Sequence, residues 1–133
     1  MLKKILVLVY YLGPILIWMS VIFYLSSRKS IQVSDIYIMN FFIFKFLHVM
    51  EYALLYFLVF RAFFFFGNNN LSLTQIMFLA IIISVLYAVS DEIHQLFVPT
   101  REGKIRDVLI DSLGILLSFV YTKKYLHLFQ KFI

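Results

Sequence analysis

The chain has 133 residues, of which 63% are hydrophobic and 14% are charged, and its formal net charge is +5. Soluble domains average about 45–50% apolar and about 25% charged residues, so the composition predicts an integral membrane protein with no room for a separate soluble domain. The absence of cysteine excludes disulfides, thiolate metal sites and cysteine nucleophiles. Basic residues beside the apolar segments explain the charge as membrane anchoring, and no nucleic acid partner is expected.

The first apolar segment covers residues 5–25, follows Lys3 and Lys4, and can cross a hydrocarbon core of roughly 30 Å. We interpret it as a transmembrane helix and not as a signal peptide. Its apolar run exceeds the usual length of about 7–15 residues, and no small-residue cleavage site follows it. Pro14 removes one backbone hydrogen bond and predicts a kink, which helices in a bundle tolerate.

The second segment, residues 40–66, is hydrophobic but carries four polar side chains near its start. At about 100° per residue, Lys45, His48 and Tyr52 fall on one helical stripe, with Glu51 at its margin. One face of this helix is therefore expected to be polar. A glycine followed by three asparagines ends the segment and predicts a turn.

The third segment, residues 71–92, ends in a cluster of ionisable side chains. Its polar residues keep to one stripe: Ser84, Tyr87, Asp91, His94 and Gln95, with Glu92 about 100° round the helix from Asp91. Such groups are expensive to place inside or at the edge of a membrane span, so they are a functional-site hypothesis by default. A short loop with Pro99, Arg101 and Gly103 follows.

The fourth segment, residues 106–125, opens with Asp107 and Asp111, which lie four residues apart. Gly114 and Ser118 continue the same face, so this side is expected to pack closely inside the bundle. Together the segments predict a single all-α membrane domain, residues 1–133, built as a bundle of about four transmembrane helices.

Alternating crossings bring the polar residues together. If all four helices cross, one half of the bilayer contains the start of segment two, the end of segment three and the start of segment four. We name this side of the bundle the motif end. All seven acids fall on that side, whereas the opposite side, the terminal end, has only the bases Lys3, Lys4, Arg61, Lys123, Lys124 and Lys131. By Lys/Arg count the two sides tie at six each, but Lys45 lies inside a span and acids beside Arg101 and Arg106 give these bases partners within the site. The purely basic terminal side is therefore placed in the cytoplasm, and a multi-pass protein of the cell membrane with both termini inside is predicted.

Three stretches in this order resemble the VanZ-like family of bacterial membrane proteins. They are His48 with Tyr52, the run from Asp91 to Pro99 with Arg101, and the run from Asp107 to Gly114. The resemblance covers most of the chain. The family commonly has a glycine before the loop arginine, where this chain has Thr100. The resemblance implies a link to resistance against the glycopeptide antibiotic teicoplanin, with which the founding member is associated, but it implies no particular molecular activity.

The candidate site combines residues from three of the segments. The candidate catalytic residues are His48, Asp91, Glu92 and His94, and the candidate binding residues are Lys45, Glu51, Tyr52, Gln95, Arg101, Asp107 and Asp111. As a binding module, the site would use Lys45 and Arg101 to attract an anionic lipid, a lipid-linked wall precursor or an amphiphilic antibiotic. As an enzyme, it would use a histidine as general base or hold a divalent metal for chemistry on a lipid.

Two other interpretations stay open. In a purely structural one, Lys45, Arg101 and Arg106 neutralise the acids and fix the helix register without chemistry. A transporter is the other, and a homo-oligomer would then supply the pathway. No metal or nucleophile motif of recognised spacing is present, so the sequence leaves the cofactor open. The preferred function is to lower susceptibility to lipid-tailed glycopeptides by binding, or acting on, an amphiphile at the outer leaflet.

Overall fold

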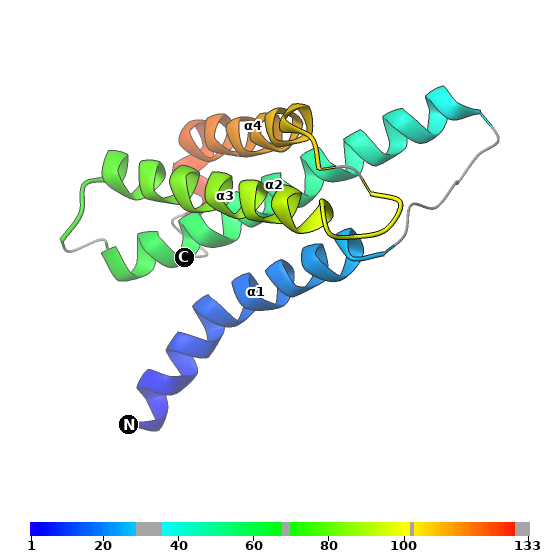
Figure 1. Ribbon diagram of the computed structural model, residues 1–133. Coiled ribbons are helices and arrows are strands. Elements are labelled where there is room, and N and C mark those ends of the chain that lie inside the picture. The colour runs from blue at the N-terminus through cyan, green and yellow to red at the C-terminus, as the bar shows by residue number, and fades with distance from the viewer. Residues whose placement is uncertain (29–35, 68–69, 102, 130–133) are drawn as a thin grey trace.

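The structure is a computed structural model, and it describes residues 1–28, 36–67, 70–101 and 103–129. Four of the charged residues counted above, Lys29, Asp35, Glu102 and Lys131, lie outside the described residues. The described chain forms four helices, α1 (Leu2–Ser26), α2 (Tyr37–Gly67), α3 (Leu73–Gln95) and α4 (Ile105–Phe129) (Figure 1). The predicted all-α fold is confirmed. Tyr125 has non-helical dihedral angles (φ −109°, ψ 20°), at the position where the fourth segment was expected to end.

Helices α2, α3 and α4 pack against one another and enclose the core (Figure 1). Large side chains of α2 fill its centre, and Tyr52, Leu55, Tyr56 and Phe60 are fully buried. Apolar side chains also cover the outside of the bundle, for example Phe46, Leu86 and Leu117, which are about two-thirds exposed in this chain alone. A helix that is apolar all round needs an apolar solvent on its outer face, as a bilayer provides.

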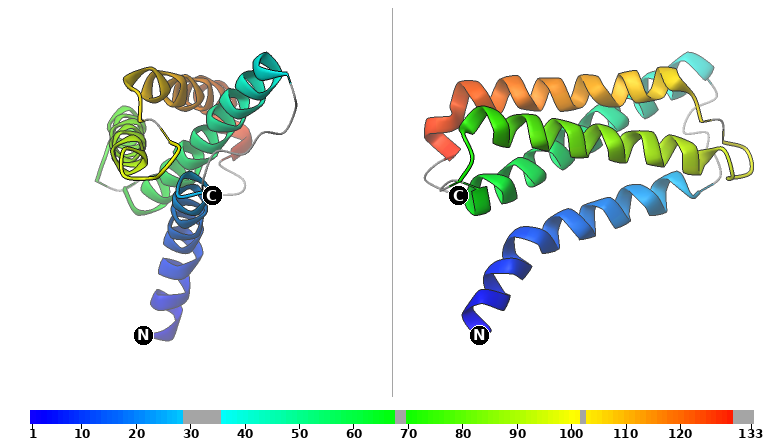
Figure 2. Two further views of the ribbon diagram at one scale, coloured as in Figure 1. Left: turned by 45° about the vertical axis from the view of Figure 1, so that its right-hand side comes forward. Right: turned by 60° about the vertical axis from the view of Figure 1, so that its left-hand side comes forward.

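Helix α1 lies against one side of this three-helix unit. Figure 2 shows that α1 bends in its N-terminal half, so that its first turns point away from the other helices. The helix contains Pro14. A proline inside a helix causes such a bend because it lacks the N–H group and crowds the preceding turn. From Tyr11 onward the helix stays in contact, with Tyr11, Ile22 and Ser26 buried. Helix α1 therefore contacts the other helices from Tyr11 to its C-terminal end.

By length and composition, three helices of the described chain can cross a membrane: α1, Ile38–Gly67 of α2, and α3. Helix α4 is as long as α1, at 25 residues, but it carries Asp107 and Asp111 near its start and Lys123 and Lys124 near its end. The protein is thus a helical membrane bundle, and the crossing by α4 stays a prediction from the sequence.

Close packing between α2 and α4 depends on Gly114. A Cβ atom at this position would lie 2.1 Å from the backbone oxygen of Val49, far inside any real contact distance. Only glycine lets the two backbones approach so closely. The prediction that this face of α4 packs tightly is confirmed, and the same approach carries Asp111, one turn earlier on α4, to the polar face of α2.

The helix ends group as the alternation of segments predicts. The end of α1, the start of α2, the end of α3 and the start of α4 lie at one end of the bundle, and the N-terminus and the end of α4 lie at the other (Figures 1 and 2). The first turns of α2 extend beyond its neighbours at the motif end (Figure 1). At the terminal end, Ser72 caps α3 through a reciprocal pair of bonds with Gln75.

Candidate functional site

Asp91 joins the end of α3 to the end of α1. Its carboxylate is 3% exposed and accepts a hydrogen bond of 2.6 Å from the Ser26 hydroxyl and one of 3.0 Å from the Gln95 amide. The two helices run in the same direction, so their C-terminal turns meet at the same depth. Burial of a carboxylate without a cation is expensive, and these two donors only partly offset its lost hydration.

Glu92 points from α3 toward α4. Its two oxygens accept hydrogen bonds from the Gln95 amide at 3.2 Å and from the backbone N–H of Lys104 at 2.9 Å. Gly103 makes this contact feasible, because a Cβ there would lie 2.2 Å from the Glu92 carbonyl oxygen. Gln95 donates to Asp91 and Glu92 together, so one amide orients both buried carboxylates of α3.

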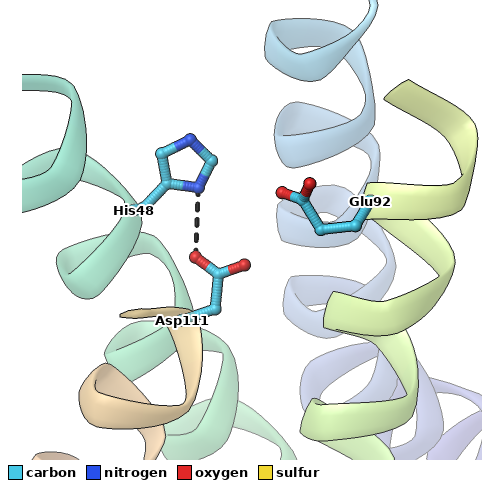
Figure 3. A group of neighbouring side chains, drawn as sticks. All are labelled: His48, Glu92 and Asp111. Atoms are coloured by element: carbon cyan, nitrogen blue, oxygen red, sulfur yellow. Dashed lines mark hydrogen bonds and ion pairs between the residues drawn. The ribbon is translucent and has the colours of Figure 1, made fainter. Parts of the chain in front are cut away.

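His48 and Asp111 form a pair between α2 and α4. The imidazole Nδ1 lies 3.1 Å from Asp111 Oδ1, and the Asp111 side chain is fully buried. Figure 3 shows the Glu92 carboxylate turned toward this pair, and one donor atom from each of His48, Glu92 and Asp111 lies within 4.8 Å of the others. The second oxygen of Asp111 has no hydrogen-bond partner among the described residues.

Lys45 pairs with Asp107 one turn nearer the motif end. The ammonium lies 2.7 Å from Asp107 Oδ2, and the two side chains are 18% and 13% exposed. The more exposed Arg106 approaches the other oxygen of Asp107 at 3.5 Å. The predicted binding residues Lys45 and Asp107 therefore bind each other across the α2–α4 interface.

His94 and Arg101 connect the α3 end and its loop to the end of α1. His94 Nε2 lies 2.9 Å from the Ser27 hydroxyl, and its ring stacks on Phe23 at a centroid distance of 4.4 Å. Arg101 donates from Nε to the Arg28 carbonyl at 2.8 Å and from a terminal nitrogen to the Leu25 carbonyl at 3.1 Å. The last carbonyls of a helix have no partner within the helix, so Arg101 caps α1.

A cavity of about 160 Å³ lies between the C-terminal half of α1 and the first half of α2. Its polar lining comes from Ser26, Arg28, His48, Glu51, Asp91 and Arg101, and its apolar lining from Ile22, Leu25, Phe44 and Leu47. The volume exceeds by far what one water molecule needs. Polar groups that converge in a mainly apolar cavity are the usual form of a small-ligand site.

Positive charge is scarce around the buried acids. In the described ranges of the chain, no lysine or arginine forms an ion pair with Asp91, Glu92 or Asp111, and the only basic side chain bonded to any of them is His48. The structural alternative, in which lysine and arginine neutralise these acids, therefore accounts for Asp107 alone. Three buried carboxylates stay without a lysine or arginine partner.

Thr100, next to Arg101, has a left-handed backbone conformation with φ 71°. A β-branched residue is strained there, whereas glycine adopts this conformation freely. The glycine that the VanZ-like family commonly has at this position would fit the loop without strain. This chain reaches the same turn at some cost in stability, of roughly 1–2 kcal/mol.

The structure brings most of the predicted site residues together and separates some. His48, Glu92 and Asp111 converge, Gln95 links Asp91 to Glu92, and Glu51 lines the cavity. His94 lies apart from His48, against α1, and Tyr52 is fully buried with an unpartnered hydroxyl. Sequence reasoning missed the hydroxyls of Ser26 and Ser27. The sequence does carry a signal for them, because two serines stand at the end of a span that is expected to run parallel to α3.

The fold and site define a class: a small helical membrane protein with a buried acidic cluster and an adjoining cavity at one end of its bundle. The family described as VanZ/LLP1 matches residues 8–129. Because the match covers most of the chain, this protein belongs to the VanZ/LLP1 family, as its sequence predicted. Comparisons with curated proteins and with solved structures give no significant match.

Proposed function

We propose that this VanZ-like protein binds the polar head group of an amphiphile in the cavity between α1 and α2, and thereby lowers susceptibility to lipid-tailed glycopeptides such as teicoplanin. The cavity is the observation that carries the proposal. Its lining residues include the acids Glu51 and Asp91 and the bases Arg28 and Arg101. Such a wall suits a head group that has both hydrogen-bond donors and an acidic group.

The surroundings of the cavity favour a ligand with a lipid tail. Phe44 and Leu47 line it on the α2 side, and the neighbouring side chains Phe42 and Phe46 are 65% and 64% exposed on the outside of the same helix. An acyl chain could follow these apolar side chains while its head occupies the polar pocket. Removing the head group from water is expensive, so only polar partners such as Asp91 and Arg101 can compensate for it.

The distribution of charge supports access from the outer leaflet. The terminal end carries Lys3, Lys4, Lys123 and Lys124 and no acid in the described residues, and a purely basic side is expected to face the cytoplasm. The cavity would then open at the depth of the outer head groups. Single cysteines at Lys4 and Thr100 test this, and only the one at position 100 should react with an impermeant reagent in intact cells. Outside labelling at position 4 would reverse the orientation.

The resistance part of the proposal rests on the family resemblance and is tested in a susceptible bacterium. Cells that express the protein should be protected more against lipid-tailed glycopeptides than against tail-less ones. Protection should disappear in Asp91→Asn, His94→Ala and Arg101→Ala variants that reach the membrane in normal amounts. Arg61→Met, a change at the terminal end, is the matched control and should keep full protection.

Two outcomes would contradict the proposal. Equal protection against both antibiotic types would mean that the tail is not recognised. Full protection by all three site variants would leave the polar groups around the cavity as a structural network.

A further inference from the structure

Two buried acids, Glu92 and Asp111, do not line the cavity, and the head-group proposal does not use their charge. They are 5% and 0% exposed, and in the described part of the chain His48, which is bonded to Asp111, is the only basic side chain that pairs with either of them. Hydrogen bonds satisfy both oxygens of Asp91 and both oxygens of Glu92. They satisfy only one oxygen of Asp111.

The unpartnered oxygen of Asp111 points to a missing ligand. It is completely buried and finds no hydrogen-bond donor among the described residues, although a buried carboxylate oxygen without a partner is rare in native proteins. Figure 3 shows this oxygen on the side of Asp111 that faces Glu92, with the imidazole of His48 completing a triangle. A cation inside the triangle would supply the positive charge and the partner that the side chains lack.

The geometry suits a metal ion. Ligand atoms of a tetrahedral zinc site with bonds of about 2.0–2.1 Å lie about 3.3 Å apart. His48 Nδ1 and Asp111 Oδ1 are already 3.1 Å apart, and all three donor atoms fall within 4.8 Å. A small shift of the Glu92 carboxylate would close the remaining distance. The ion would replace the hydrogen bond between His48 and Asp111, and with Asp111 bidentate it would also be the partner of the second carboxylate oxygen.

The hydrogen bonds around Glu92 resemble those that orient carboxylate ligands in metal sites. Ligating carboxylates are usually oriented by further hydrogen bonds, and here the Gln95 amide and the Lys104 backbone N–H hold Glu92 in place. The three donors come from α2, α3 and α4, so an ion would also tie together the three helices of the core.

We propose that His48, Glu92 and Asp111 bind one divalent metal ion of the Zn²⁺ or Mn²⁺ type. One imidazole and two carboxylates are a donor set that both ions accept, and three protein ligands leave a coordination position free. Because His48 also lines the cavity, a bound ion sits next to the proposed head-group site. The metal site does not depend on the proposed resistance function.

The experiment uses the full chain, purified in detergent without chelators. Elemental mass spectrometry should find about one Zn²⁺ or Mn²⁺ per chain. After removal of metal with a chelator, addition of Zn²⁺ or Mn²⁺ alone should raise the thermal unfolding temperature. Glu92→Gln and Asp111→Asn should weaken metal binding by at least about tenfold.

Asp91→Asn is the matched control. It makes the same acid-to-amide change next to Glu92 on α3, but Asp91 is not one of the three proposed metal ligands. It should retain the metal even though it is expected to lose protection against glycopeptides, so failures of the two proposals are distinguishable. A folded wild-type protein whose unfolding temperature neither ion raises would overturn the metal site. So would Asp111→Asn protein that binds the ion as tightly as wild type.

Discussion

The two ends of the bundle are held together by different interactions. At the terminal end, Tyr11 stacks on Phe65 with a centroid distance of 4.1 Å, and the Arg61 guanidinium lies 4.3 Å and 4.8 Å from the ring centres of Tyr10 and Tyr11. At the motif end, α1 is joined to the other helices by directional hydrogen bonds such as Ser26 to Asp91. Aromatic contacts tolerate small shifts of a helix, whereas buried carboxylates require fixed partners.

This difference suggests different roles for the two ends of the bundle. Aromatic stacking could hold the helices together at both ends at little cost in stability, since a bilayer accommodates apolar groups. Instead, the motif end buries Asp91, Glu92 and Asp111 without a lysine or arginine partner among the described residues. An arrangement that lowers stability is expected where a ligand must bind. We therefore infer that the terminal end anchors the bundle and that the motif end is the ligand site.

The largest effect is expected from Gly114→Ala, which attacks the α2–α4 contact beneath the site. The added Cβ would collide with the Val49 carbonyl and force the two backbones apart, so we expect a loss of about 3 kcal/mol in the free energy of unfolding. The control is Gly13→Ala in α1, where a Cβ would meet only a Val9 methyl at 3.8 Å. That change should be neutral or stabilising in denaturant titrations.

The next effect comes from Lys45→Met. It strands the Asp107 carboxylate, which is 13% exposed, and should lower stability by about 2 kcal/mol, less than for a fully buried pair. The double variant Lys45→Met, Asp107→Leu should regain most of the loss, because the only charge then left unpaired at this contact is the exposed Arg106. Strictly additive losses in denaturant titrations would argue against the pair.

A smaller effect is expected at the terminal end. Tyr11→Leu removes the stacking on Phe65 but keeps a buried apolar side chain, so stability should fall by about 1 kcal/mol. Protection against glycopeptides should be unchanged at matched membrane levels. If protection were lost while the protein stayed folded, the division into anchor and site would be wrong.

The smallest effect is expected for Thr100→Gly, and it should be favourable. Glycine relieves the strain at φ 71° but gives the unfolded chain more freedom, so the gain should be below about 1 kcal/mol. Thermal unfolding against wild type measures it, with Thr74→Gly in the helical first turn of α3 as a control that should destabilise. An unfolding temperature below that of wild type would contradict a strained loop.

The sequence predicts the fold well because each apolar segment is long and bounded. The turn signal after α2 predicts where α3 begins, and the polar stripe from Ser84 to Gln95 predicts where it ends. The burial of Ser84, Asp91 and Gln95 confirms the stripe. Periodicity reports which side of a helix faces inward, and this is also why the α2–α4 contact at Gly114 could be anticipated.

Pairings between helices are harder to predict, because they depend on axial position and helix rotation, which periodicity leaves free. Arg101 could attract a ligand or neutralise an acid by sequence alone, whereas in the structure it caps α1, and Lys45 is bonded to one particular acid, Asp107. The convergence of His48 with Glu92 and Asp111 joins three helices and has no linear motif. Likewise, the part played by Ser26 and Ser27 depends on the parallel course of α1 and α3.

Glu51→Gln tests whether the motif end is a ligand site. Glu51 lines the cavity, and its side chain forms no ion pair within the described ranges, so the change should leave folding intact. The measurement is the inhibitory concentration of a lipid-tailed glycopeptide for cells that hold equal amounts of wild-type or variant protein. We expect the variant to protect no better than cells without the protein. Full protection by Glu51→Gln would contradict a ligand in this cavity.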